Sequence, residues 1–327
     1  MHYIFIESPD PANTPVTAWH NGGPGCSSLE GLFQEMGALW VDENDPSKLV
    51  VNPNAWTNIS SMIFLEAPAC VGYSYADTLD GCAHNDSSQA VDNYNAYRKF
   101  FELFPEYSTL PFFITGESYA GIYVPTLAQQ IVLGNEAGQP KINLQGIAVG
   151  NGCLGKEVGV CAFDYLNERN TNIPFFFGHG LISPQTYASV VSACPTSGED
   201  HTAECQALID QAHSEVGNVN VYNIYGPCVV GVSRVDEGVI DKASGRRVYT
   251  KVPVPFHENG PIACIDETIA IYLSKPEVAA ALHVIPTLHF AVCGSNSSFA
   301  YTRTEDDERV DVYPTIWGAG VRVLVYK

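Results

Sequence analysis

The sequence predicts an α/β protein with a mostly parallel central sheet flanked by helices and an inserted cap region. Three observations lead to this fold class. Short apolar runs rich in β-forming residues alternate with longer segments of helical period through the first half of the chain. The pattern becomes irregular from about residue 155 to residue 262 and is regular again afterwards. The chain has 327 residues, 46% of them hydrophobic, which suits one large domain with an insertion.

These patterns divide the chain into three parts. We expect residues 1–154 to form the first part of a core, residues 155–262 a cap, and residues 263–327 a return to the core. The candidate strands of the first part are residues 2–7, 15–20, 61–66, 111–116 and 143–150. A helix between the third and fourth strands is expected to start at Ser87 or Ser88. Its apolar stripe consists of Ala90, Tyr94, Tyr97, Phe101 and Phe104.

The cap and the final part follow in order. The aromatic run Phe175 to Phe177 and many turn residues distinguish the cap. Regular order returns with a helical segment from Asp266 to Leu273. We expect Ser274 to cap, and Pro276 to open, the helix that comes next. The last segment, Val321 to Tyr326, is an apolar strand.

Composition excludes several classes of function. The 36 acidic and 16 basic residues give a formal charge of −20, which opposes binding to nucleic acid and to anionic membranes. No run of 18 apolar residues is present, so we expect no membrane span. No pattern indicates a cofactor or an oligomeric state. The ten cysteines include no C-x-x-C pair and no flanking pair of histidines, so we expect disulfides and no metal site.

Cysteines and glycosylation motifs favour the secretory pathway. Disulfides form in oxidising compartments, and ten cysteines is a high count for a cytosolic enzyme. Sequons for N-glycosylation occur at Asn58, Asn85 and Asn296. We therefore expect an extracellular, vacuolar or lysosomal protein. The chain opens with MHYIFIE, which is typical of a strand, so we also expect a signal peptide to be missing from it.

Ser118 is the candidate nucleophile. The strand Phe112 to Thr115 leads into the sequence GESYAG at residues 116–121, and Ile122 to Leu133 is compatible with a helix. A G-x-S-x-[GA] pattern between a strand and a helix is typical of a strained turn that presents a serine hydroxyl at the edge of a sheet. The alternative is a serine in an ordinary glycine-rich turn.

A second motif gives that serine a context. The sequence WHNGGPGCSS at residues 19–28 follows an early strand and precedes a helix. Adjacent glycines let backbone N–H groups approach an oxyanion, as in the loop that supplies half of an α/β-hydrolase oxyanion hole. Taken alone, this segment could be only a tight loop. The two motifs together are much more specific than either one.

Together, W-x-N-G-G-P-G-C-S-S and G-E-S-Y-A-G resemble the serine carboxypeptidase family, which has the α/β-hydrolase fold and includes carboxypeptidase Y and cathepsin A-like enzymes. The resemblance continues through residues 66–68, 72–75, 150–152 and 272–284, so it covers nearly the whole chain. It implies a serine-type carboxypeptidase that removes C-terminal residues from peptides and proteins through an acyl-enzyme on Ser118. Peptide or protein C-termini would be its binding partners.

The resemblance also implies roles for residues around Ser118. The backbone N–H groups of Gly23 and Tyr119 would form the oxyanion hole. The substrate's terminal carboxylate would be bound by Asn21, Gly22, Glu35 and Glu117. Carboxyl groups packed together keep a proton that can be donated to this carboxylate, so binding should weaken as pH rises. For Glu35 the alternative is a solvated helix residue.

Departures from the family pattern concern one histidine and several cysteines. His20 stands where the family usually has an apolar residue, and Cys70 where it usually has glycine. Cys70 with Cys82, and Cys153 with Cys161, resemble local extra bridges. The pairs implied by the family are Cys26 with Cys293, Cys194 with Cys205 and Cys228 with Cys264. Sequence alone leaves other pairings open.

The triad partners of Ser118 are expected after the last strand. The chain order in this fold is Ser, Asp, His, and the matching family positions lie beyond Lys327. We therefore expect the chain as given to be incomplete and inactive. The candidate substitutes within it, all in segments typical of scaffold or cap, are Asp266, His179, His283 and His289.

Two other functions remain open from the sequence. One is an acyltransferase related to the serine carboxypeptidases, against which Asn21 argues, because such relatives tend to alter this carboxylate-binding position. The other is a catalytically inactive protein that binds peptides or another partner.

Overall fold

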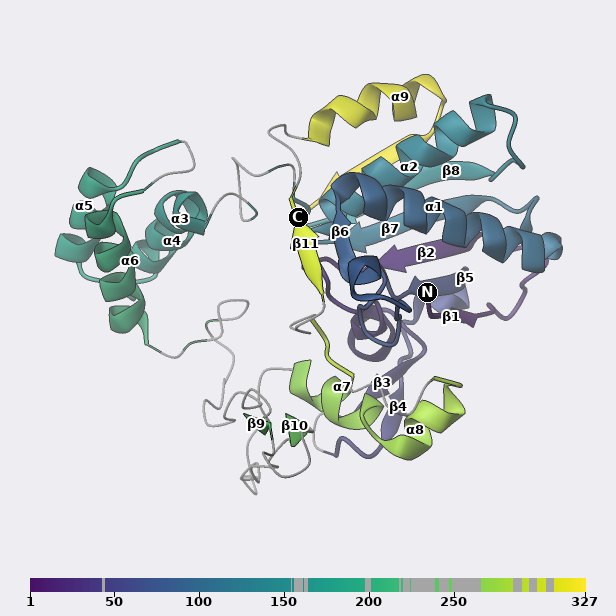
Figure 1. Cartoon of the computed structure of the whole chain (residues 1–327), viewed down its shortest axis with the longest axis horizontal. Coiled ribbons are helices and arrows are strands. Elements are labelled where there is room, and N and C mark those ends of the chain that lie inside the picture. Colours follow the sequence, from purple (N-terminus) through teal and green to yellow (C-terminus); the bar gives the residue numbers. More distant parts are fainter. Residues whose placement is uncertain are drawn as a thin grey trace.

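In the computed structural model, the described residues are 1–42, 45–153, 155, 161, 164–197, 201–217, 219, 224, 239–240, 247–248, 266–284, 290–293, 299–303 and 309–327. A six-stranded sheet lies at the centre (Figure 1). In spatial order its strands are β1 (Tyr3–Ile6), β5 (Ser61–Leu65), β2 (Val16–His20), β7 (Phe112–Glu117), β8 (Leu144–Gly150) and β12 (Arg322–Tyr326). β1 is antiparallel to β5, and the other neighbours are parallel. All six overlap the strands predicted from the sequence.

The two faces of the sheet belong to two apolar cores. In β5, Ile63 and Leu65 pack into one core, whereas Met62 and Phe64 pack into the other. Side chains of successive strand residues point to opposite faces, so a strand covered on both faces is apolar throughout. This is why short apolar runs located the strands.

Helices cover both faces, as Figure 1 shows. The first core lies against α1 (Asp86–Leu103), α2 (Ala120–Glu136) and α9 (Tyr313–Gly318). The second lies against the short π-helix η1 (Gly31–Glu35), α7 (Asp266–Leu273) and α8 (Pro276–Ala281). A hairpin of β3 (Leu39–Val41) and β4 (Leu49–Val51) adjoins η1.

Two predicted helix starts need correction. α1 is capped by Asn85, whose side chain accepts a hydrogen bond from the backbone N–H of Ser88, so the predicted start at Ser87 or Ser88 is wrong. Ser88 is instead the third helical residue and completes a capping box with Asn85. α8 has Lys275 at its N-cap, without a side-chain cap, so the predicted cap at Ser274 is also wrong. Pro276 opens α8 as predicted.

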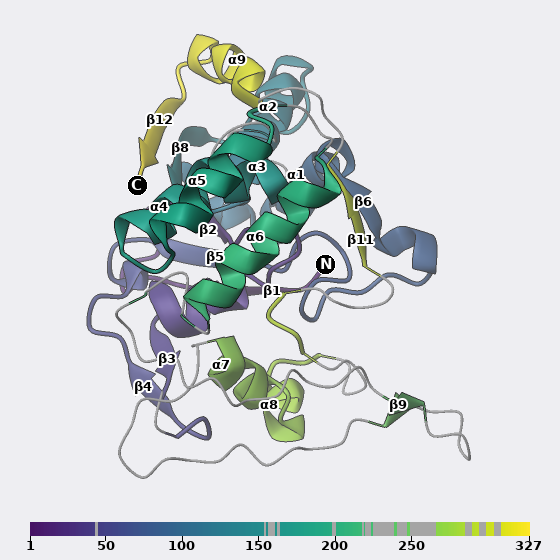
Figure 2. The same ribbon diagram turned by 90° about the vertical axis from the view of Figure 1, so that its left-hand side faces the viewer.

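A helical group within residues 164–216 forms a separate core. It comprises α3 (Asp164–Asn167), the π-helix η6 (Glu168–Asn172), α4 (Ile173–Gly178), α5 (Pro184–Ala193) and α6 (Ala203–Val216). Ile173, Phe176, Val190 and Ile209 are buried together there. Figure 1 shows this group set apart from the sheet, on the side toward which β2 and β7 point, and Figure 2 views the molecule from that side. We propose that these helices belong to the cap predicted for residues 155–262.

Short elements complete the described chain. They are η2 (Trp56–Asn58), η3 (Leu79–Cys82), β6 (Ala83–Asn85), η4 (Pro105–Tyr107), β9 (Val239–Ile240), β10 (Arg247–Val248), β11 (Ala300–Thr302) and η7 (Arg309–Val312). β11 pairs in parallel with β6, which brings the late segment around Tyr301 beside the start of α1. Within the described ranges, no helix is both long and apolar enough to cross a bilayer.

Disulfides join four cysteine pairs of the described chain. The pairs are Cys26 with Cys293, Cys70 with Cys82, Cys153 with Cys161 and Cys194 with Cys205. These are four of the five pairs expected from the sequence. The fifth, Cys228 with Cys264, lies outside the described residues. The first pair joins positions 267 residues apart and ties the glycine-rich loop to the segment that follows α8.

Candidate active site

Ser118 lies in a sharp turn between β7 and α2. Its backbone φ is +57°, in the left-handed region that non-glycine residues rarely adopt. The turn is held by hydrogen bonds from the Ser118 N–H to the Gly150 carbonyl, 3.1 Å, and from the Cys153 N–H to the Ser118 carbonyl, 2.8 Å. A strained residue persists only where its surroundings fix it, as these contacts do. The turn therefore presents the serine side chain at the end of the sheet.

Small residues around Ser118 are required by close backbone approach. A Cβ atom at Gly116 would lie 2.5 Å from the carbonyl oxygen of His20. At Gly121 it would lie 2.2 Å from the carbonyl oxygen of Cys153. Real Cβ atoms do not come this close to other atoms, so both positions accept only glycine without a shift of the backbone.

The glycine-rich loop packs directly against this turn. β2 is in register with β7, with His20 opposite Gly116, so the loop that follows β2 starts beside the serine turn. A Cβ atom at Gly22 would lie 2.4 Å from the backbone nitrogen of Tyr119 and 2.8 Å from the Cβ of Ser118. Gly23, the next residue, is exposed. The two motifs that the sequence separates by about a hundred residues thus form one surface.

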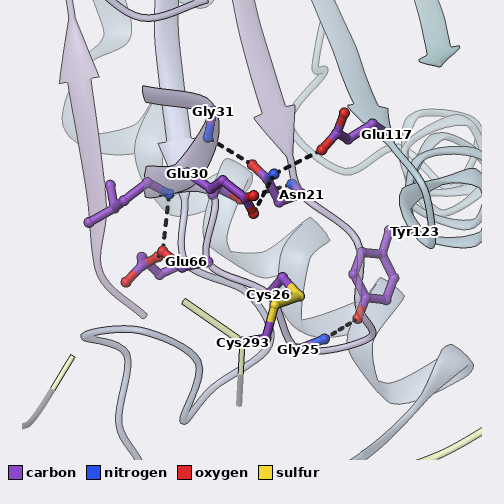
Figure 3. Close-up of a disulfide and its surroundings, with 12 residues drawn as sticks. Asn21, Gly25, Cys26, Glu30, Gly31, Glu66, Glu117, Tyr123 and Cys293 are labelled. Carbon is purple, nitrogen blue, oxygen red and sulfur yellow. Dashed lines mark hydrogen bonds between the residues drawn. A yellow bond between two sulfur atoms is a disulfide. The ribbon is translucent and has the colours of Figure 1, made fainter. Parts of the chain in front are cut away.

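Three carboxyl groups converge on the side-chain amide of Asn21; Figure 3 labels two of them, those of Glu30 and Glu117. Its Nδ2 lies 3.2 Å from Glu30, 3.3 Å from Glu35 and 3.2 Å from Glu117. Its Oδ1 accepts hydrogen bonds from the Trp19 indole, 2.7 Å, and from the backbone of η1. The amide orientation is fixed by these donors, so its NH₂ group faces the carboxyl groups. We call Asn21 with Glu30, Glu35 and Glu117 the acidic cluster.

Carboxyl groups in the acidic cluster hold protons tightly. Burial, together with the negative charges of Glu117 and Glu30, raises the pKa of Glu35. Burial also raises the pKa of Glu117, which shares a hydrogen bond with Glu35. Carboxyl groups this close cannot all ionise at neutral pH, so a proton stays between Glu35 and Glu117. The cluster can therefore donate hydrogen bonds to an anion.

Sequence reasoning missed Glu30. The side chains of Glu30 and Glu35, five residues apart, would point in different directions on an α-helix, whose turn takes 3.6 residues. The intervening segment is a π-helix, in which the Met36 N–H bonds back five residues to the Gly31 carbonyl. This wider turn lets both carboxyl groups reach Asn21. Periodicity gave no signal for it, since single π-turns carry no distinct sequence pattern.

A second group of polar side chains surrounds Tyr119, the residue that follows Ser118. Asp86, which is 4% exposed, accepts hydrogen bonds from the hydroxyl groups of Tyr119, 2.8 Å, and Tyr301, 2.6 Å. The hydroxyl of Tyr123 accepts a hydrogen bond from the backbone N–H of Gly25, 3.2 Å (Figure 3). We call Asp86, Tyr119, Tyr123 and Tyr301 the tyrosine cluster. No pattern in the sequence indicated this cluster.

Two buried polar residues, His20 and Glu66, make hydrogen bonds at the two ends of the glycine-rich motif. His20, where the sequence departs from the family, is hydrogen-bonded through Nε2 to the Tyr97 hydroxyl, 2.9 Å, and burial lowers its pKa to about 4. Glu66 is fully buried and accepts hydrogen bonds from the Ser27 hydroxyl and the Tyr73 backbone. Burial raises the pKa of Glu66 to about 7.

The other predicted site residues lie elsewhere in the fold. Asp266 begins α7, His179 follows α4 and His283 follows α8. His289 lies outside the described residues. The positions of the triad Asp and His stay a prediction. Among the sequons, Asn58 is exposed in η2, Asn85 caps α1 and Asn296 is outside the described residues.

Comparison with known proteins covers the whole chain. A sequence model described as serine carboxypeptidase matches residues 1–327. Serine carboxypeptidase-like 20 of Arabidopsis thaliana is 31% identical over 365 residues, covering 100% of this chain and 71% of the plant protein. The lysosomal protective protein of Mus musculus is 35% identical over 350 residues, covering 100% of this chain and 70% of the mouse protein.

One solved structure supports the fold. Kex1(delta)p, a prohormone-processing carboxypeptidase of Saccharomyces cerevisiae, is similar with a TM-score of 0.66 and 18% sequence identity. The match covers 99% of this chain and 68% of the yeast chain. The α/β-hydrolase architecture predicted from the sequence is thereby confirmed.

Proposed function

This chain belongs to the serine carboxypeptidase family of hydrolases, and we propose that Ser118 is the nucleophile with which it would remove the C-terminal residue of a peptide. The observation that carries this proposal is the position of Ser118. Its strained turn, φ +57°, packs against the glycine-rich loop, and the residue before it, Glu117, belongs to the acidic cluster. A substrate that places its terminal carboxylate at the acidic cluster would bring its last peptide bond to the serine.

The proposed chemistry begins with attack by the Ser118 oxygen on the carbonyl carbon of that bond. The hydroxyl proton passes to a general base, and the carbonyl oxygen becomes an oxyanion. We assign the backbone N–H groups of Gly23 and Tyr119 to this oxyanion. Preorganised donors of this kind are the largest single contribution to many such reactions. The base returns this proton to the nitrogen as the C–N bond breaks, which releases the terminal amino acid and leaves an ester on Ser118 that water hydrolyses.

We assign the substrate's terminal carboxylate to Asn21, the backbone of Gly22, Glu35 and Glu117. Asn21 supplies N–H donors, and the proton shared by Glu35 and Glu117 supplies another. This arrangement distinguishes a free C-terminus from an amide, because only the carboxylate accepts all of these hydrogen bonds. It supports a carboxypeptidase in preference to an endopeptidase.

We further propose that the protein enters the secretory pathway and works in an acidic or extracellular compartment. The disulfides require an oxidising environment, and the relative from mouse is by its name lysosomal. The exposed Asn58 and the cap residue Asn85 are then the proposed glycosylation sites within the described residues. Asn296 remains a third candidate from its sequon alone.

Calorimetric binding of N-blocked dipeptides to the whole chain with Ser118→Ala tests the carboxylate assignment without turnover. We expect a dipeptide with a free C-terminal leucine to bind about 10- to 150-fold more tightly than its amide, the range for hydrogen bonds to a charged group. Equal affinities for the two would overturn the proposal.

A peptide boronic acid tests Ser118 itself. Boron forms a bond with the serine oxygen, the hydroxyl proton goes to water, and the tetrahedral adduct places an oxygen where the oxyanion would lie. We expect saturable binding to the whole chain that Ser118→Ala abolishes. Binding that survives this substitution would remove Ser118 from the proposed role.

A further inference from the structure

We propose that Asp86 is a positioning residue for the oxyanion hole, because it fixes Tyr119 through the phenol hydroxyl and so fixes the backbone N–H of Tyr119. The inference rests on the proposed function, which assigns that N–H to the oxyanion. Asp86 would act through Tyr119 and would not touch substrate.

The contacts of Tyr119 hold its side chain on several sides. Its hydroxyl donates to Asp86 at 2.8 Å, and its ring lies edge-to-face with Tyr123, 5.3 Å between centroids, and with Tyr301, 5.7 Å. The guanidinium carbon of Arg303 lies 5.4 Å from the ring centroid. Tyr119 is 4% exposed. The hydrogen bond from the hydroxyl to the Asp86 carboxylate is directional, so it limits the rotation of the side chain.

Fixing this side chain matters because of the residue before it. Ser118 has a φ of +57°, and such strained backbone is stable only when its neighbours hold it. Tyr119 is the N-cap of α2 and has no side-chain cap bond to the helix, so its hydroxyl is free to anchor elsewhere. Anchoring at Asp86 resists a rotation of the 118–119 peptide that would relieve the strain and turn the N–H away.

The same cluster reaches the second donor of the oxyanion hole. Tyr123, one helical turn after Tyr119, accepts the N–H of Gly25 at 3.2 Å. Gly25 follows Gly23 by two residues, in the loop whose Gly22 backbone touches the Tyr119 nitrogen. The tyrosine cluster therefore connects both proposed donors, and Asp86 is its only carboxylate.

A charged acceptor suits this position. Asp86 is the first residue of α1, where the unpaired backbone N–H groups and the helix dipole favour a negative charge. Hydrogen bonds from neutral donors to a carboxylate are about twice as strong as those between neutral groups. Burial, followed by the charge and hydrogen bond of Asp86, raises the pKa of Tyr119 and so keeps its hydroxyl protonated as a donor.

The experiment measures the affinity of the whole chain for the N-blocked peptide boronic acid, whose adduct needs the oxyanion hole. The variants are Asp86→Asn, Tyr119→Phe, both together, and Tyr301→Phe. Tyr119→Phe keeps the ring and the backbone N–H and removes only the hydroxyl that reaches Asp86. Tyr301→Phe is the comparison variant: it removes the other hydroxyl on Asp86, which comes from β11, and leaves the hydrogen bond from Tyr119 to Asp86 in place.

We expect Asp86→Asn and Tyr119→Phe each to weaken boronate binding by about 10-fold, within the 10²-fold effect of misplacing a reacting group. The double variant should bind the boronic acid as tightly as either single variant, because both substitutions remove the same hydrogen bond between Tyr119 and Asp86. Tyr301→Phe should weaken binding less than Tyr119→Phe does, because it leaves the Tyr119–Asp86 hydrogen bond in place. A free-carboxylate dipeptide, bound at the acidic cluster, should bind all four variants unchanged.

Three results would overturn the inference. The first is multiplicative losses in the double variant, which would mean that Asp86 and Tyr119 act separately. The second is equal loss of boronate and dipeptide binding, which would mean general damage to the fold. The third is unchanged boronate affinity in Asp86→Asn. If the unsubstituted chain binds the boronic acid no better than Ser118→Ala does, the proposed role of Ser118 fails as well, and the two failures are thereby distinguished.

Discussion

The residues on either side of Ser118 belong to two clusters that stabilise their carboxyl groups differently: one retains a proton, and the other provides hydrogen-bond donors. Glu117 lies in the acidic cluster, where three carboxyl groups share one amide and retain a proton. Tyr119 lies in the tyrosine cluster, where one carboxylate accepts two hydroxyl groups. The acidic cluster has three carboxyl groups for one amide NH₂ group, so its acceptors outnumber its donors. In the tyrosine cluster two hydroxyl groups donate to the one carboxylate of Asp86. The difference teaches that pH could change how the proposed site would bind a carboxylate while leaving the geometry of the serine turn intact.

The largest expected effect comes from removing the Cys26–Cys293 disulfide, which anchors the loop that joins the two clusters. Cys26 follows the loop that connects Asn21 to Gly25, and its disulfide to Cys293 anchors that loop. Replacing both cysteines by serine should lower the free energy of unfolding by about 2–5 kcal/mol, typical for a native disulfide. Denaturant unfolding measures this.

The matched control for that variant is replacement of Cys194 and Cys205, which close a bridge of 11 residues within the helical group. It should destabilise the chain and leave binding of a free-carboxylate dipeptide unchanged, whereas the Cys26 variant should weaken binding as well. Unchanged dipeptide affinity without the Cys26 bridge would mean that the clusters are held independently of the loop.

Asn21→Asp tests the donors of the acidic cluster alone. The new side chain keeps an oxygen for the Trp19 indole and for η1, but it removes the NH₂ group that faces the carboxyl groups. Affinity for a free-carboxylate dipeptide should fall about 10- to 150-fold, the worth of hydrogen bonds to a charged group. Affinity for the boronic acid should stay within about 3-fold; a comparable loss there would mean that the two clusters are not separate.

The buried His20–Tyr97 pair disfavours the protonated, charged form of His20. The pKa of His20 is lowered to about 4 by burial, so the unfolded chain binds more protons than the folded chain between about pH 4 and pH 6.5. Stability from this residue is therefore full above pH 6.5 and is lost as pH falls. Replacing His20 by leucine and Tyr97 by phenylalanine should recover about 1–2 kcal/mol of the stability lost on going from pH 7 to pH 5. Thermal unfolding at both pH values measures the change; an identical loss in the variant would place the pH sensitivity elsewhere.

The smallest expected effect is the pH dependence of the acidic cluster. The raised pKa values of Glu35 and Glu117 mean that the donating proton is present at low pH and is lost as pH rises through them. Affinity for a free-carboxylate dipeptide should therefore fall with rising pH, by at most about tenfold per pH unit, the limit for one proton. Glu117→Gln, which carries N–H donors at every pH, should flatten this profile.

The amide of the same dipeptide is the control for that measurement, and its affinity should not depend on pH. The same raised pKa values make the folded chain bind more protons above about pH 4.5, so their contribution to stability is full below that pH and declines above it. A dipeptide affinity that rises with pH would contradict the proton assignment.

Sequence reasoning located what depends on local pattern. Strands such as β5 and β7 were predicted because their residues are buried on both faces, and Ser118 because its motif has small residues at positions 116 and 120. Helix starts were less certain, since Asn85 and Ser88 both belong to one capping box. Local chemistry restricts these positions strongly enough to be read from one sequence.

The parts that sequence reasoning missed depend on distant contacts. Tyr301 meets Asp86 across 215 residues, through the pairing of β11 with β6. Neither short strand has a pattern that would predict its partner. Glu30 was missed because periodicity assumes an α-helix, and η1 is a π-helix. These side chains become neighbours through the tertiary fold, which the residue types alone do not predict.

The π-turn at residues 31–35 makes the composition of the acidic cluster depend on how this segment winds. If the same residues wound as an ordinary α-helix, the five-residue step from Glu30 to Glu35 would turn the chain by about 500°, so the two side chains would lie about 140° apart and could not both face Asn21. An ordinary side-chain substitution changes one group at a time, whereas this change of winding would alter the number of acids at the proposed carboxylate site without replacing either glutamate. Sequence changes that switch the segment between π and α winding are therefore a route by which related enzymes could acquire different pH ranges.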